Sequence, residues 1–307
     1  MGVQQIMTTE NGASPSTLRK IFTGASGLRA GWRFALFNLL FFVIAFSILS
    51  VRRALTPGGF KGNSFTAPVV ALQEVIFLLA LFLTLAVMHR IEKRPFRLDF
   101  LPRQRGAGRD FGAGIIYGLS AITILLFGLR MLHALSFDSM ALHGIQAVKF
   151  ALLWAFAFLL VGVFEESFSR GYAQATLWQG IGFWPAAIVN SLIFAAIHMT
   201  NSGESALGIL SVLSVALFFC FTLWWTGTLW FAVGFHAAWD YGETFIYGVP
   251  DSAEVATGHL LNAHVYGTRW ITGGSVGPEG SALVFVVYGM AALIFVLWRK
   301  KEAAICQ

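Results

Sequence analysis

Two adjacent glutamates and an arginine stand at the end of a strongly apolar run, within residues 164–171. Ionisable groups there are costly, about 2.5–3.5 kcal/mol each at the centre of a spanning helix, so they usually persist by pairing or by lining a functional cavity. Glu166 and Arg170 are four residues apart in the favourable acid-before-base order, and we expect them to pair. Glu165 is rotated by about 100° from Glu166 around a helix, which leaves it available as a base. The alternative is that both acids cap an interfacial turn and reach water.

Two other apolar segments each carry a histidine on a polar helical face. The first face consists of Asn190, Phe194 and His198, at intervals of four residues. The second consists of His236, Asp240 and Glu243. Side chains three or four positions apart share one side of a helix, so each set points its polar groups in one direction. A membrane histidine often serves only helix packing, and a His–Asp pair often locks neighbouring helices. The combination with Glu165 instead predicts an acid and two imidazoles around one water molecule.

The composition indicates which elements must position these residues. The chain has 307 residues, of which 57% are hydrophobic and 12% charged, and this is too apolar for a soluble domain of that length. The formal net charge of +6 would suit nucleic acid, but the basic residues cluster between apolar runs, where membrane topology places them. We therefore expect a lipid bilayer and no nucleic acid among the partners. Cys220, within an apolar run, and Cys306, near the last residue, indicate neither a bridge nor a metal pair.

Eight apolar segments recur along the chain, each close to the roughly 20 residues that cross a bilayer. They cover residues 34–51, 67–88, 112–132, 147–168, 183–199, 206–225, 229–248 and 281–298. The sequence therefore predicts an all-α fold, a polytopic membrane protein with about eight transmembrane helices and the candidate groups inside the bundle. We divide it into a polar tail over residues 1–28, which lacks the apolar stretch of a signal peptide, and one integral membrane domain over 29–301. The catalytic core is expected at 147–248.

One strongly basic loop, between residues 89 and 110, indicates the orientation. It contains Arg90, Lys93, Arg94, Arg97, Arg103, Arg105 and Arg109. By the positive-inside rule this loop and both termini are cytoplasmic, and the glycine-rich connection 249–280 is external. Arg52, Arg53 and Lys61 oppose this orientation, because they would then lie outside.

Three motifs follow one another in these segments. Residues 165–170 read Glu-Glu-x-x-x-Arg, residues 194–198 read Phe-x-x-x-His, and residues 236–240 read His-x-x-x-Asp. Together they resemble the CAAX protease and bacteriocin-processing (CPBP, or Abi) family of intramembrane endopeptidases. Each motif is weak alone, but three in family order are specific, and the pattern of eight apolar segments extends the similarity to most of the chain. Residues 272–281 also look like a segment that precedes the last span in bacterial members.

The resemblance implies peptide-bond hydrolysis, with Glu165 as the general base that activates water and His198 assisting it. His236 and Asp240 would stabilise the oxyanion. The supporting residues would be Glu166, Arg170 and Phe194. This chemistry is physically sound, because a carboxylate kept from bulk water can act as a base near neutral pH. Donors aimed at a developing oxyanion are often the largest catalytic contribution.

Asp240 departs from the CAAX prenyl endopeptidases, which carry Asn at this place, whereas other bacterial members accept Asp. An ionised Asp would repel an oxyanion, so Asp240 is either protonated, or orients His236, or helps to bind a metal. In the metal alternative, zinc would take Glu165, His198, His236 and Asp240, an acceptable set of N and O ligands. The family was formerly classed as metalloproteases. Because the sequence has no His-Glu-x-x-His, we expect no cofactor and rank zinc second.

Two other classes of function stay open at this point. A membrane scaffold or immunity factor would keep the fold without needing catalysis. A proton-coupled transporter would use Glu74, within the second apolar segment, in a relay with the Glu–His set. For the protease, the expected substrate is a membrane-associated protein or peptide, prenylated or not. The expected location is a cell membrane, crossed several times, with a bacterial cytoplasmic membrane preferred.

Overall fold

The computed structural model describes residues 21–24, 27–55, 65–99, 101, 106–201 and 203–305. Most of the expected polar tail, together with Lys61, Arg103, Arg105 and Cys306, lies outside these residues.

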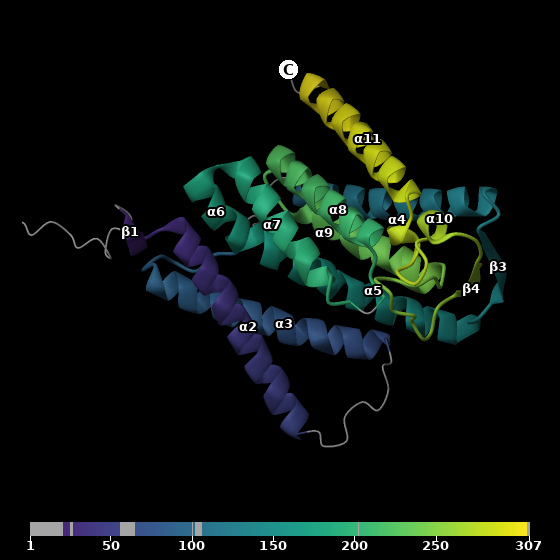
Figure 1. Cartoon of the computed structure of the whole chain (residues 1–307), viewed down its shortest axis with the longest axis horizontal. Coiled ribbons are helices and arrows are strands. Elements are labelled where there is room, and N and C mark those ends of the chain that lie inside the picture. The colour runs from purple at the N-terminus through teal and green to yellow at the C-terminus, as the bar shows by residue number, and fades with distance from the viewer. Residues whose placement is uncertain are drawn as a thin grey trace, which may run out of the picture.

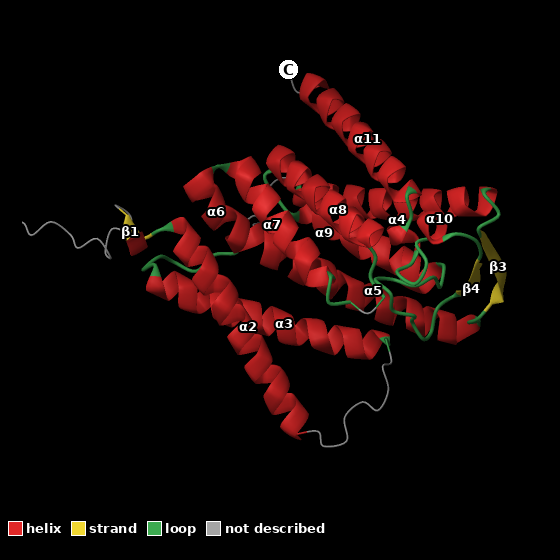
Figure 2. Cartoon of the chain, in the orientation of Figure 1, coloured by secondary structure: helices red, strands yellow, loops and turns green. Residues whose placement is uncertain are grey.

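Helices make up nearly all of the described chain (Figures 1 and 2). The α-helices are α2 Ala30–Leu55, α3 Ala67–Ile91, α4 Ala107–Met131, α5 Gly144–Ser167, α6 Ala173–Ile181, α7 Phe183–His198, α8 Ala206–Thr226, α9 Trp230–Asp240, α10 Arg269–Thr272 and α11 Leu283–Ile305. Two π-helical turns, η1 Phe168–Tyr172 and η2 Tyr241–Ile246, and one 3-10 turn, η3 Pro278–Gly280, complete the helical elements. The strands are β1 Thr23–Gly24, β2 Gly27–Leu28, β3 Leu135–Met140 and β4 Leu261–Val265, paired as two antiparallel two-stranded sheets.

The predicted all-α polytopic membrane architecture is confirmed. Among the described residues, six helical stretches are long and apolar enough to cross a bilayer: α2, α3, α4, the continuous stretch Gly144–Ile181, α8 and the helix beginning at Leu283. Every predicted apolar segment coincides with helix, but the number eight is not confirmed. Helix α7 has 16 residues and α9 has 11, fewer than the roughly 20 that a spanning helix needs.

Large apolar side chains point outward from these helices. Phe46 on α2 is 74% exposed, and Ile145 at the start of α5 is 77% exposed. A soluble protein rarely presents so much apolar surface, whereas hydrocarbon is a favourable medium for it. The outer surface of the helices therefore agrees with a lipid environment.

Glycines allow three helices to approach one another closely at α9. A Cβ atom added to Gly114 or Gly118 of α4 would stand 2.2 Å from the carbonyl oxygen of Phe231 or Phe235 on α9. A Cβ atom added to Gly162 of α5 would stand 2.9 Å from the carbonyl oxygen of Val233. Small residues four positions apart are the usual means by which membrane helices pack backbone against backbone. Helix α9 thus lies tightly between α4 and α5.

The connection 249–280, expected as a polar external stretch, folds back onto the bundle. Its strand β4 pairs antiparallel with β3, so that Leu135 lies opposite Val265. The amide of Ala253 donates to the carbonyl oxygen of Val276 at 2.9 Å, which closes the connection on itself. These contacts join residues far apart in sequence, so local periodicity did not predict them. Their result is that the connection lies beside the end of α9.

Candidate functional site

The acidic motif lies where a long helix changes its winding. Glu165 and Glu166 occupy the last turn of α5, and the chain then continues through the π-helical turn η1 into α6. Inside η1, Gly171 leaves helical geometry, with ψ at −113°. Single π-turns within α-helices are frequently found at functional sites. Beyond Arg170 the chain stays helical as α6, which ends at Ile181 before Gly182.

A buried chain of charged groups stands behind the motif. Arg170 Nη1 donates to Glu166 Oε2 at 2.8 Å, and the two side chains are only 1% and 0% exposed. The expected pair is therefore present. The other carboxylate oxygen of Glu166 accepts a hydrogen bond from His236 Nδ1 at 3.0 Å. The Arg170 guanidinium also lies over the rings of Phe194 and Phe219, at 4.8 and 5.5 Å from their centroids.

The second ring nitrogen of His236 faces two more acids. Its Nε2 lies 3.7 Å from Glu165 Oε2 and 3.6 Å from Asp240 Oδ2. Glu166 accepts the hydrogen bond from His236 Nδ1, and this bond orients the imidazole ring. The other ring nitrogen, Nε2, is therefore directed towards Glu165 and Asp240. The site therefore presents one oriented imidazole nitrogen between two carboxylates.

His198 ends α7 and is held by its own helix. Its Nδ1 donates to the carbonyl oxygen of Phe194 at 2.9 Å, and the two rings pack with centroids 4.5 Å apart. The hydrogen bond at Nδ1 leaves Nε2 available to another group. His198 and Glu165 both line the same cavity, and no direct hydrogen bond joins them among the described residues.

One cavity of about 480 Å³ brings the predicted catalytic residues together. Its lining includes Glu165, His198, His236 and Asp240, which come from α5, α7 and α9. Phe194 lines it too, whereas Glu166 and Arg170 lie behind the wall as supporting groups. A volume of this size suits a short peptide segment or a small ligand.

Glu74, which the sequence singled out only for a transporter, also lines this cavity. It comes from α3, is 6% exposed, and its Oε2 has no hydrogen-bond partner.

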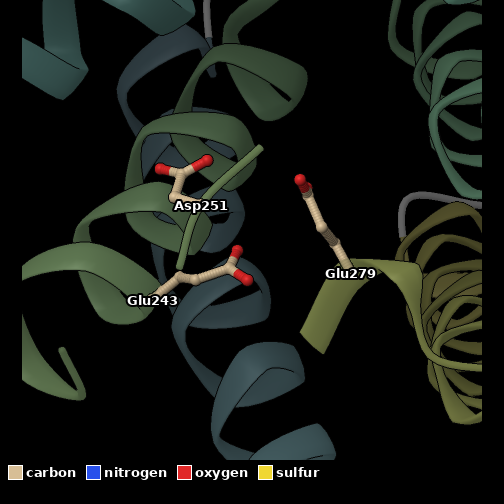
Figure 3. A group of neighbouring side chains, drawn as sticks. All are labelled: Glu243, Asp251 and Glu279. Atoms are coloured by element: carbon tan, nitrogen blue, oxygen red, sulfur yellow. The ribbon is translucent and has the colours of Figure 1, made fainter. Parts of the chain in front are cut away.

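Three further acids lie close together, and two of them, Asp251 and Glu279, line the cavity. Glu243, Asp251 and Glu279 turn their carboxylates towards one another, with ligand oxygens within 4.8 Å (Figure 3). Burial, opposed by a hydrogen bond from Thr244, raises the pKa of Asp251 to about 6. Burial, followed by repulsion from Asp251, raises the pKa of Glu279 to about 8. Oxygen atoms at this spacing could receive a hard cation or a positively charged group of a ligand.

The zinc alternative named a different set of residues. The ligand atoms of Glu165, His198, His236 and Asp240 are not gathered within the same mutual distance in the described part of the chain; only the group of Figure 3 is. Only Glu243 of that group was indicated by a local pattern, since it continues the helical face of His236. Asp251 and Glu279 lie in an irregular connection, where no periodicity indicates which way a side chain points.

Residues 147–242 match the family model described as type II CAAX prenyl endopeptidase, Rce1-like. This segment contains all three motifs and the helices that carry them, so the predicted resemblance is confirmed. No curated protein matches the chain. The family match indicates a protease, and with the apolar helices it indicates a multi-pass membrane protein with a protein substrate.

Proposed function

Because the helices around the cavity match a family of membrane endopeptidases, we propose that the chain hydrolyses a peptide bond within the membrane by means of a water molecule that Glu165 activates. The observation that carries the proposal is the cavity itself. An acid and two imidazoles from separate helices line it together, and one imidazole is oriented by a buried carboxylate.

In the proposed reaction, Glu165 accepts a proton from water while the oxygen of that water attacks the scissile carbonyl carbon. His198 orients the water from across the cavity, since its Nδ1 is already engaged. The oxyanion of the tetrahedral intermediate receives a hydrogen bond from His236 Nε2. The intermediate then collapses, the C–N bond breaks, and Glu165 returns its proton to the leaving amine.

Asp240 and Glu166 act in this scheme through His236. We assign Asp240 as a carboxyl group that orients the His236 ring: its Oδ2 lies 3.6 Å from Nε2, too far for a hydrogen bond, so the Nε2 hydrogen is left for the oxyanion. Glu166 holds the other ring nitrogen, and Arg170 balances its charge. All three are positioning residues rather than groups that touch substrate.

Zinc remains the alternative mode of the same hydrolysis, with Glu165, His198, His236 and Asp240 as its ligands. In the glutamic mode, protease activity of the purified protein survives prolonged treatment with a strong chelator. Loss of activity on chelation, restored by Zn²⁺, would replace the glutamic mode by the metal mode.

The proposed substrate is a membrane-associated protein or peptide, and the proposed location is a bacterial cytoplasmic membrane. Comparing the membrane proteomes of cells that carry the wild-type chain or Glu165→Gln tests the function and identifies substrates together. We expect proteins that stay uncleaved only in the variant cells. Identical proteomes and an unchanged phenotype would instead favour a scaffold or immunity factor.

A further inference from the structure

The cavity wall contains more acidic residues than hydrolysis requires. Six of its lining residues are acids: Glu74, Glu165, Asp240, Asp251, Glu254 and Glu279. Two imidazoles face them, and no Lys or Arg is among the described residues of the lining. The proposed reaction uses only two of the six acids. The other four therefore need another explanation.

Glu74 is the acid whose surroundings are least satisfied. It enters from α3, which carries no other residue of the proposed reaction, and it is 94% shielded from solvent. Its Oε2 is buried without any hydrogen-bond partner. A buried carboxylate oxygen without a donor costs free energy comparable to a lost hydrogen bond, so it is expected where a ligand supplies the donor.

A second unsatisfied carboxylate oxygen lies beside two acids of the cavity lining, Asp251 and Glu279. Glu243 is fully buried, and Trp239 Nε1 donates to its Oε2 at 2.7 Å, but its Oε1 has no partner. This oxygen belongs to the group of Figure 3, where Asp251 and Glu279 approach it from the connection 249–280. Two separate places therefore lack a donor or a positive charge.

We propose that the cavity selects a peptide segment with a positively charged side chain close to the scissile bond. The inference rests on the proposed endopeptidase function and names its substrate class. A lysine or arginine side chain supplies a donor such as Glu74 Oε2 lacks, and a positive charge that suits a wall rich in carboxyl groups. Phe65, Val69 and Val70, which also line the cavity, suit apolar neighbours on the same segment.

The acidic residues of the lining also disfavour a substrate whose C-terminal carboxylate lies close to the scissile bond. A CAAX sequence stands at the C-terminus of its protein, so its free α-carboxylate would enter a cavity that is already acidic. Like charges at short distance in a poorly solvated site repel strongly. We therefore expect cleavage at an internal bond of a longer chain.

Matched peptides in proteoliposomes test the inference. One apolar peptide sequence is made with Lys, norleucine or Glu beside the scissile bond. Each peptide is made in two lengths: one continues well beyond the scissile bond, and the other ends shortly after it with a free α-carboxylate. For the wild-type protein we expect kcat/KM to be roughly tenfold higher for Lys than for norleucine, and lowest for Glu and for the free acid.

Variants then assign the preference to the cavity. Glu74→Gln and Glu279→Gln, made singly, should each lower the Lys-to-norleucine ratio several-fold. Asp138→Asn is the matched control, since Asp138 is an exposed acid on β3 outside the cavity lining, and it should leave the ratio unchanged. The ratio is read only from variants whose thermal unfolding matches that of the wild type.

The outcomes separate the two proposals. No cleavage of any peptide, with substrates also absent from the proteome comparison, removes the proposed function. Cleavage with equal rates for Lys and norleucine overturns the cation preference and leaves the endopeptidase standing. A Lys preference that is unchanged in both Glu74→Gln and Glu279→Gln also overturns the proposal that these acids select a cationic side chain.

Discussion

Glu166 Oε1 lies 3.0 Å from His236 Nδ1, although the two residues are 70 positions apart. This contact joins the acidic motif on α5 to the histidine on α9, and it does so from behind the cavity, where the Glu166 side chain is fully buried. The orientation of the His236 imidazole, the proposed oxyanion donor, therefore depends on Glu166, which does not contact the substrate in the proposed reaction.

Replacing Glu166 by Gln should therefore lower kcat and leave KM nearly unchanged. A carboxylate that orients a histidine typically contributes about 10- to 100-fold, and Gln keeps the shape but loses the charge that sets the tautomer. Steady-state kinetics with one peptide substrate measure both constants. An unchanged kcat would remove the positioning role, and a raised KM alone would indicate a binding role instead.

Removing the charge of Arg170 alone should destabilise the protein more than removing the charges of both Arg170 and Glu166. Arg170→Met leaves the Glu166 carboxylate buried without its guanidinium partner, a change that costs about 3–5 kcal/mol. The double variant Arg170→Met with Glu166→Gln should recover part of that free energy. Unfolding in detergent measures the three proteins, with Arg130→Met, an exposed arginine on α4, as the control. Equal losses in the single and double variants would contradict the argument.

Glu165→Gln and His198→Ala should each abolish proteolysis while the protein stays folded and inserted. The first removes the proposed base and the second removes the group that orients water. Purified variants are compared with the wild type for cleavage and for thermal unfolding. Retained cleavage by both, at wild-type stability, would end the enzyme hypothesis.

A methyl group at Gly118 should separate α4 from α9. The added Cβ atom would stand 2.2 Å from the carbonyl oxygen of Phe235, so backbone must move, and overpacking of this kind costs about 1–3 kcal/mol. Since His236 follows directly on α9, activity should fall as well. Gly128→Ala on the same helix is the control, because its Cβ would meet only Leu283, at 3.9 Å. Equal behaviour of the two variants would contradict tight packing at α9.

The preference for a cationic segment should grow as pH rises from 6 to 9. Glu279, with its pKa raised to about 8, is largely neutral at the lower pH and becomes ionised at the higher one. Among its neighbours, the acids Asp251 and Glu204 raise this pKa further, whereas the backbone amide and the hydroxyl of Ser252 lower it by donating hydrogen bonds to Glu279 Oε1. The Lys-to-norleucine ratio of kcat/KM measures the effect, since titrations that affect both peptides alike cancel. A ratio that is flat with pH, or a rise as large in Glu279→Gln as in the wild type, would contradict it.

Local patterns predicted the features that depend on local sequence. The apolar runs predicted every long helix, and the four-residue spacing predicted that Glu166 and Arg170 would pair. Contacts between distant segments were beyond such patterns: the bond from His236 to Glu166 and the pairing of β3 with β4. Helix α9 was expected to span, but glycine-mediated packing lets 11 residues lie between longer helices.

Asp251 and Glu279 belong to the connection 249–280, whereas the groups of the proposed reaction belong to helices. The proposed selectivity is thus encoded partly in a segment that the proposed chemistry does not use. Substitutions in this one connection can alter which sequences are cleaved without disturbing the helices that cleave them, and relatives with the same helices are free to process quite different proteins.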